Sequence, residues 1–126
     1  IARKRVPQIG ILVSNLSGAK LTSYISQLLR LTMLELVRRD CVIRLLNGEL
    51  EDWGLDDHFD AIISLAYDES VNRLMSEYPA PVISLNNPLA ASCLYEIHSD
   101  HRQSARIATE YLLPRGHRNI MMICYK

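Results

Sequence analysis

The sequence has few aromatic residues, few glycines and no excess of either charge. Lys and Arg together number 14, and Asp and Glu also number 14, so the formal net charge is zero. A nucleic-acid-binding module is usually basic, and we therefore do not expect this chain to bind nucleic acid by itself. No apolar run approaches the ~18 residues of a membrane span, so we expect no membrane partner. Apolar residues nevertheless make up 48% of the 126 residues, which argues against a largely disordered protein and predicts one globular domain.

Cysteine is also scarce and shows no metal or disulfide pattern. The three cysteines are Cys41, Cys93 and Cys124; they form no C-x-x-C pair, and their number is odd. We expect them to be small apolar residues in a reducing, cytoplasmic compartment. The five glycines form neither G-x-G-x-x-G nor a P-loop, and there is no G-x-S-x-G element. The sequence therefore offers no enzyme motif, and we expect no catalytic activity, cofactor or metal.

Short apolar runs alternate with amphipathic helical stretches along the chain. The periodicity predicts helices at residues 22–39, 69–78 and 101–113 and strands at residues 9–14, 41–46, 59–65, 82–85, 95–98 and 119–124. Strands that alternate with helices are typical of an α/β fold with one parallel sheet and helices on both faces. We therefore expect a single α/β domain over residues 1–126.

The helix predicted at residues 22–39 carries two apolar stripes. The stripe that would cover a sheet consists of Ile25, Leu29, Met33 and Leu36. The second stripe, which points away from the first, consists of Tyr24, Leu28, Leu31 and Leu34. A contiguous apolar patch of this kind usually marks a protein contact, so the second stripe predicts a subunit interface. The alternative is that the acidic loop around Trp53 folds over it within one chain.

Small polar or acidic residues stand where the predicted strands end. They include Ser14, Asn15, Ser64, Asp68, Asn86 and Asp100. Ligands of open α/β sheets bind outside the carboxyl ends of the strands, and such groups suit a hydroxyl-rich ligand because each hydroxyl both donates and accepts hydrogen bonds. The same residue types form turns and helix caps, so the composition of these loops leaves both interpretations open.

The pattern H-x-D-H, formed by His98, Asp100 and His101, also has two interpretations. His and Asp are both metal ligands, which would make this a metal site. The simpler interpretation is that Asp100 or Ser99 caps the helix that begins at about residue 101, beside two ordinary histidines.

Several segments of the second half follow a distinctive order. Residues 100–102 read Asp-His-Arg, residues 108–113 read Ala-Thr-Glu-Tyr-Leu-Leu, and residues 116–120 read Gly-His-Arg-Asn-Ile. Together with residues 59–63 and 81–88, they resemble the effector-binding core of the LacI/GalR family of bacterial transcriptional repressors. That core has the periplasmic-binding-protein type I fold, and the resemblance implies the strand order 2-1-3-4-5-6.

The resemblance also implies a function. The chain would be the N-terminal of two subdomains that close around a small-molecule effector of the sugar or nucleoside class, and residues 1–126 alone would bind it weakly because half of the cleft is missing. Effector-side residues, carried over by position, are Asn15, Ser17, Ser64, Asp68, Asn86 and Asp100. DNA would be bound only by a separate helix-turn-helix domain, with residues 1–7 at the end of its linker. The repressor would be a homodimer that pairs partly through this subdomain.

Three other protein classes share the alternating pattern. A periplasmic-type sugar-binding protein would be distinguished by a secretion signal in the full gene, where a repressor would carry a helix-turn-helix. A small α/β enzyme domain would show a titratable pair that converges at the strand ends. A two-component receiver domain needs an Asp at the end of its third strand and an acidic pair after its first. Ser64-Leu65 and Ser14-Asn15 do not meet these requirements.

Overall fold

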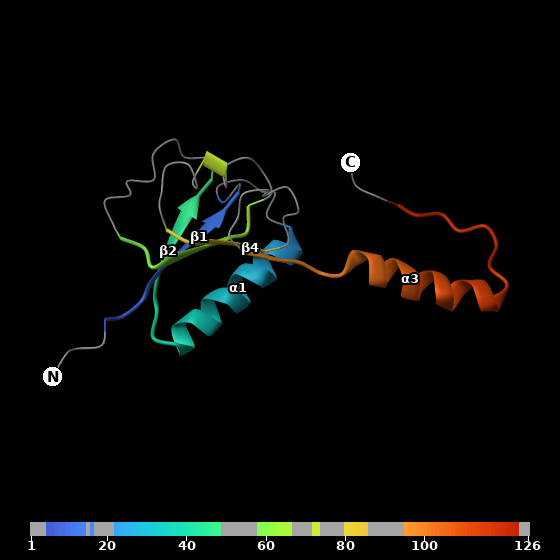
Figure 1. The fold of residues 1–126 in the computed structure, drawn as a ribbon, viewed down its shortest axis with the longest axis horizontal. Coiled ribbons are helices and arrows are strands. Elements are labelled where there is room, and N and C mark those ends of the chain that lie inside the picture. Colours follow the sequence, from blue (N-terminus) through green and yellow to red (C-terminus); the bar gives the residue numbers. More distant parts are fainter. Residues whose placement is uncertain are drawn as a thin grey trace.

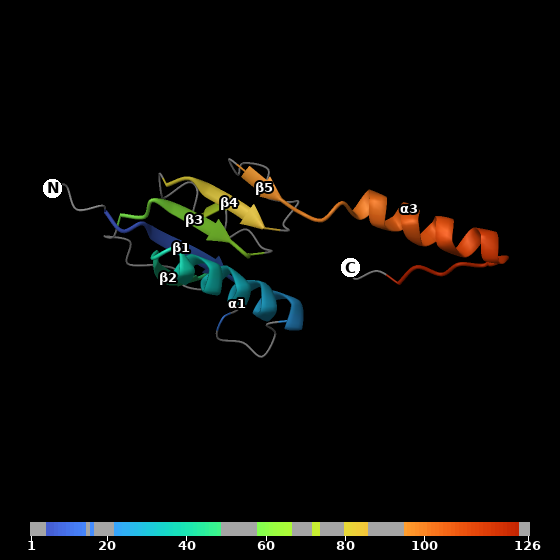
Figure 2. The same cartoon turned by 90° about the horizontal axis from the view of Figure 1, so that it is seen from below.

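Branched aliphatic runs form the strands of a parallel sheet in the computed structural model. The structure describes residues 5–14, 16, 22–48, 58–66, 72–73, 80–85 and 95–123. The strands are β1 (Gln8–Val13), β2 (Val42–Asn47), β3 (Ala61–Ser64), β4 (Val82–Leu85) and β5 (Tyr95–Ile97), and the helical segments are α1 (Ser23–Arg38), α3 (His101–Leu112) and the 3-10 helix η1 (Leu113–Arg115). The sheet order is β2-β1-β3-β4-β5, and every pair is parallel (Figure 2). The α/β class and the order expected for the first five strands are confirmed.

Strand β1 lies inside the sheet and forms the centre of the core. It pairs with β2 over its whole length, from Gln8 to Val13, and with β3 on its other side. Three of its residues are completely buried: Ile11, Leu12 and Val13. Burial of consecutive residues requires cover on both faces, which is the reason such a strand is a continuous apolar run.

Neighbouring side chains pack closely against the backbone of β1 at Gly10. A Cβ atom on Gly10 would lie 3.3 Å from both Ile62 Cγ1 and Leu46 Cδ1. The missing side chain therefore lets side chains of the two neighbouring strands approach the backbone of β1.

Helix α1 covers one face of the sheet with the stripe that the sequence predicts. Thr22 caps it, because the Thr22 Oγ1 accepts a hydrogen bond from the Ile25 amide at 3.3 Å. Ile25 is buried in a cluster with Ile11 and Val13. The other three residues of the stripe pack against this cluster: Leu29, Met33 and Leu36.

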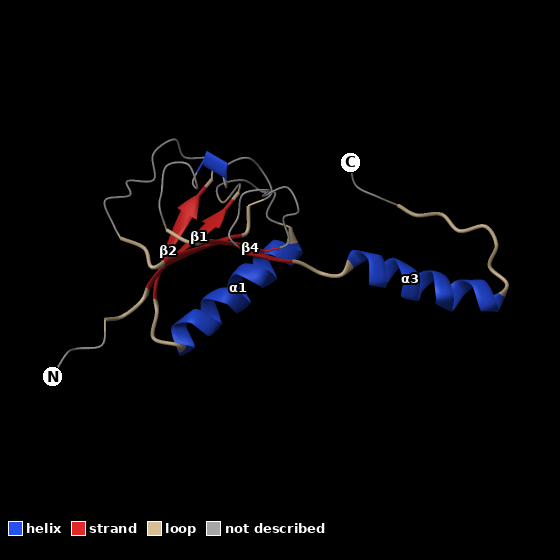
Figure 3. Cartoon of the chain, viewed as in Figure 1, coloured by secondary structure: helices blue, strands red, loops and turns tan. Residues whose placement is uncertain are grey.

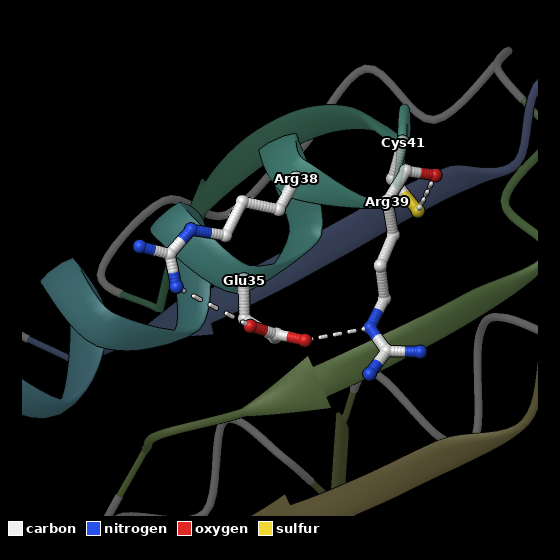
Figure 4. A network of polar contacts seen from close by, with 4 residues as sticks. All are labelled: Glu35, Arg38, Arg39 and Cys41. Atoms are coloured by element: carbon white, nitrogen blue, oxygen red, sulfur yellow. Dashed lines mark hydrogen bonds and ion pairs between the residues drawn. The ribbon is translucent and has the colours of Figure 1, made fainter.

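The end of α1 is held by exposed charged contacts (Figure 4). Glu35 accepts a hydrogen bond from Arg39 Nε at 2.8 Å and lies 4.0 Å from Arg38 Nη1. Such exposed pairs contribute little free energy, at most ~1 kcal/mol. They stand where the chain reverses toward β2 through Asp40, whose φ of 55° is in the left-handed region.

The opposite face of the sheet carries helical residues of a second element. Asn72 and Arg73 are helical and lie on the side of the sheet away from α1 (Figures 1 and 3). Arg73 Nη2 donates a hydrogen bond to the Gly48 carbonyl at 3.4 Å, which connects this element to the end of β2. The rest of the helix predicted at residues 69–78 lies outside the described residues.

Helix α3 projects away from the sheet (Figures 1 and 2). The sequence predicts a core face made of Ser104, Ala105, Ile107, Ala108, Tyr111 and Leu112, and this prediction is wrong. None of the residues of α3 is buried, and Ile107 and Tyr111 are 57% and 58% exposed. The physical reason is that residues 98–100 lead the chain onward past the end of β5 instead of turning it back across the sheet. Of the helices described, none has both the length and the apolar content needed to cross a bilayer.

The prediction of a sixth strand at residues 119–124 is also wrong for residues 119–123, which are the ones described. Residues 119–123 form no strand, and Met121 and Ile123 are 86% and 88% exposed. A strand exists only when it pairs with another, whereas the preference of branched residues for strands is weak and depends on context. Because α3 carries the chain away from β5, this segment does not reach the sheet edge.

Two matched valines test the position of the core. We expect Val13→Ala to lower the free energy of unfolding by roughly 1.5–3 kcal/mol, since it removes two buried carbons and leaves a cavity. Val42→Ala makes the same change at a side chain that is 53% exposed, and its cost should stay below about 0.5 kcal/mol. Urea unfolding followed by circular dichroism measures both. Equal losses would contradict the burial of β1.

Candidate functional site

The carboxyl ends of the parallel strands meet at one edge of the sheet. The chain leaves β1 for β2 on one side and returns to β3 on the other, so the strand order reverses between β1 and its neighbours. In open α/β sheets this reversal point is where ligands bind. Backbone contacts extend the ladder just past the strands: the Gly48 amide donates to the Val13 carbonyl and the Leu65 amide donates to the Leu12 carbonyl, both at 2.8 Å.

Two serine hydroxyls lie side by side below this edge. Ser64 of β3 is in register with Ser84 of β4, and both are completely buried. The Ser64 Oγ accepts a hydrogen bond from the Ala66 amide at 3.3 Å. The Ser84 Oγ has no hydrogen-bond partner among the described residues. The predicted ligand residue Ser64 is therefore an internal hydroxyl that also shapes the turn after β3.

Ser84 is a residue that the sequence analysis did not select. A signal for it does exist, because Ile-Ser-Leu occurs at residues 63–65 and again at residues 83–85. The repeat puts a hydroxyl at the same level of two adjacent strands. A buried hydroxyl without a partner is unfavourable by about 1–3 kcal/mol, so it is a feature that packing alone does not explain.

Asp100 stands at the exit from β5 and caps α3. Its Oδ1 accepts a hydrogen bond from the Gln103 amide at 2.9 Å, and its carbonyl accepts one from the Ser104 hydroxyl at 3.0 Å. This confirms the cap interpretation of the H-x-D-H pattern. The ring of His98 contacts the Ser99 carbonyl through Nδ1 at 3.1 Å. Within the part of the chain that the structure describes, no three His, Cys, Asp or Glu residues are arranged to hold a metal ion.

Four of the six predicted ligand residues are not described by the structure. Asn15, Ser17, Asp68 and Asn86 lie outside the described residues. Their role in binding stays a prediction.

A small hollow lies beside the carboxyl ends of β4 and β5. Its volume is about 230 Å³, and it is lined by Tyr24, Leu28, Leu85, Ile97, His98 and Ser99. The aliphatic side chains provide an apolar floor, while His98 and Ser99 bring polar atoms to one side. The volume is smaller than the roughly 300–1,000 Å³ of sites for drug-sized ligands. Sequence reasoning missed His98 and Ser99 as lining residues, although both directly follow β5.

The residues of the second stripe of α1 lie in two different environments. Tyr24, Leu31 and Leu34 are 52%, 52% and 41% exposed, as an outward-facing stripe requires. Leu28 instead packs partly against the core cluster and reaches the hollow near β5. Next to the stripe is a largely apolar groove of about 440 Å³, lined by Ser26, Leu29, Arg30, Met33, Leu34 and Val37. The acidic loop around Trp53, which could cover this surface, lies outside the described residues.

Comparison of this chain with models of protein families, with curated proteins and with solved structures finds no match. The features that bear on a function are therefore the sheet, its carboxyl edge and the sequence resemblance.

The cap on α3 leads to a local prediction. We expect Asp100→Ala to weaken the start of α3 by about 1 kcal/mol, because the Gln103 amide loses its acceptor, whereas Asp100→Asn should keep most of the cap. Since none of the residues of α3 is buried, the loss should appear as faster amide exchange at residues 103–106 and not as a lower midpoint for unfolding of the sheet. If Asp100→Ala instead lowers the midpoint for unfolding of the sheet, α3 unfolds together with the sheet.

Proposed function

We propose that this domain binds a small, hydroxyl-rich effector at the carboxyl edge of its sheet, as the effector-sensing core of a transcriptional repressor similar to the LacI/GalR family. The observation that carries the proposal is the parallel order β2-β1-β3-β4-β5, which places a strand reversal at the ends of β1 and β3. This order agrees with the first five strands that the resemblance implies. Reversal points of this kind are the common ligand sites of α/β sheets.

The chemistry of the edge supports an effector with several hydroxyls. Asp100 lies at the exit from β5, where a carboxylate can accept a hydrogen bond from a ligand hydroxyl while one of its oxygens caps α3. His98 and Ser99 line the adjacent hollow together with aliphatic groups. A sugar or nucleoside has both kinds of surface, since its ring carbons are apolar and its hydroxyls both donate and accept.

The net charge of the chain supports a repressor in which effector and DNA are bound by different domains. With a net charge of zero, this domain has no overall positive charge to attract the phosphate backbone. In the proposed repressor a separate helix-turn-helix domain contacts the operator, and this domain controls it by changing conformation when effector binds between two subdomains.

The exposed surface of α1 supports a second copy of the chain as the protein partner. Leu31, Leu34 and Val37 expose large aliphatic side chains along one helix. A two-fold axis would place this surface against itself, which is the geometry of most homodimers and suits a repressor that reads a near-palindromic operator.

The effector proposal is tested with one carboxylate variant. We expect titration calorimetry with a panel of monosaccharides and nucleosides to detect binding by the full-length protein and only weak binding by residues 1–126. Asp100→Asn keeps the helix cap but removes the charge, so the effector affinity should fall about 10- to 150-fold, equivalent to about 1.5–3 kcal/mol. Arg102→Ala, in the first turn of the exposed helix, is the matched control and should bind as the wild type does. Unchanged affinity of Asp100→Asn would remove Asp100 from the site, and no binding by the full-length protein would overturn the proposal.

The dimer proposal is tested on α1. We expect Leu31→Glu combined with Leu34→Glu to convert a dimer of the full-length protein into a folded monomer in sedimentation velocity, because the pairing would bury four like charges. Arg102→Glu combined with Arg106→Glu places two glutamates at exposed positions of α3 instead and should leave the dimer intact. A wild-type protein that is monomeric at micromolar concentration would contradict the interface.

A further inference from the structure

The amino ends of the strands form a second edge of the sheet, opposite the carboxyl edge at which the effector is proposed to bind (Figure 2). The chain reaches this amino edge through residues 5–7 and enters β1 at Gln8. Residues 5–7 are exposed and belong to no helix or strand. Exposed segments beside a strand detach easily unless specific contacts hold them.

Asp60, which directly precedes β3, contacts the entering segment through both oxygens of its carboxylate. The Asp60 Oδ2 accepts a hydrogen bond from the Gln8 amide at 2.8 Å, and the Oδ1 lies 3.4 Å from Arg5 Nη2. The backbone amide of Asp60 also donates to the Gln8 carbonyl at 2.8 Å. One residue therefore holds the segment by its backbone, by a charge-assisted hydrogen bond and by an ion pair.

The position of Asp60 is fixed by the parts of the chain on either side of it. Phe59 before it is buried, and β3 follows it directly. On the other side of β1, the Val42 amide donates to the Pro7 carbonyl at 2.9 Å. The ring of a proline holds φ at about −65°, so the backbone at Pro7 has little freedom to rotate. Residues 5–8 are thus held between the starts of β2 and β3.

The ion pair is too exposed to contribute much to folding. The side chains of Arg5 and Asp60 are 64% and 38% exposed, and a pair of this kind favours the closed arrangement by about fivefold at most. Its effect falls on the detachment of residues 5–8, which is a local opening, and not on the unfolding of the whole sheet.

We propose that Asp60 is a positioning residue that clamps residues 5–8 to the amino edge and so fixes where the preceding chain leaves the domain. In the proposed repressor that chain is the linker to the DNA-binding domain, and this role rests on the proposed function. Each residue released from the edge adds up to ~3.5 Å of reach to the linker. Two DNA-binding domains that read half-sites at a fixed spacing then search a larger volume, which lowers the effective concentration of the second domain once the first is bound.

The clamp is tested with trypsin on residues 1–126, with each cut identified by mass spectrometry. Trypsin takes the side chain of Arg5 into its specificity pocket, so it cuts the bond between Arg5 and Val6 only when residues 5–8 detach. Asp60→Asn keeps an acceptor for the Gln8 amide and removes the charge, and we expect it to accelerate this cut about two- to fivefold. Asp60→Ala loses both contacts and should accelerate the cut roughly 10-fold or more.

A control and a second measurement separate the clamp from a general loss of stability. Glu35→Gln removes the carboxylate that contacts Arg38 and Arg39 at the end of α1, and it should leave the cut after Arg5 unchanged. The midpoint of urea unfolding should be the same for Asp60→Asn and the wild type. If the cut after Arg5 accelerates no more than the other tryptic cuts while the midpoint falls, Asp60 only stabilises the sheet and the clamp is wrong. An unchanged cut in Asp60→Ala would equally overturn it.

The role of the linker is tested separately on the full-length protein. The probe is a DNA duplex that the wild-type protein selects from a random-sequence pool. We expect Asp60→Ala to bind this duplex about 5-fold more weakly or worse, because its linkers are longer, and to keep the wild-type affinity for any monosaccharide or nucleoside that the wild type binds at the opposite edge. Equal affinities of Asp60→Ala and the wild type for the duplex would overturn the linker role. A full-length protein that selects no duplex would overturn the proposed function, whereas the clamp itself is decided by the trypsin experiment, which needs neither DNA nor effector.

Discussion

The burial of β1 between its two neighbours is the constraint on which the rest of the structure depends. Ile11, Leu12 and Val13 are completely buried, so both faces of the sheet must be covered at this point. Helix α1 supplies one cover through Ile25 and its stripe. Pairing on both sides also fixes where β2 and β3 end, because Val13 and Leu12 accept hydrogen bonds from Gly48 and Leu65. The level of the carboxyl edge, and with it the candidate site, therefore follows from the register of one strand.

Features encoded over a few residues could be predicted from the sequence. The aliphatic run of β1, the buried stripe of α1 and the Asp100 cap all agree with the structure. Each depends on side chains within about one helical turn, or on a run of apolar residues, and so needs no knowledge of the remaining chain.

Features decided by distant contacts could not be predicted in the same way. The composition of residues 119–123 suits a strand, but whether the strand forms depends on the direction of α3, which the local sequence does not encode. The site shows the same limit: the position of Ser64 at a strand end was predictable, whereas its complete burial and its pairing with Ser84 depend on the register between β3 and β4. Periodicity assigns a residue to an element, and register decides which residues become neighbours.

The paired serines also bear on what the sheet is adapted to do. Alanine at position 84 would fill a similar space without leaving a hydroxyl unsatisfied, and exchanging a buried polar group for an apolar one of like shape is often neutral or favourable. A sheet optimised only for thermodynamic stability would thus have an aliphatic pair there. The sheet has such a pair two residues earlier on the same strands, at Ile62 and Val82. The two serines instead place polar groups at one level of an otherwise apolar interior, which a core selected for stability alone does not need.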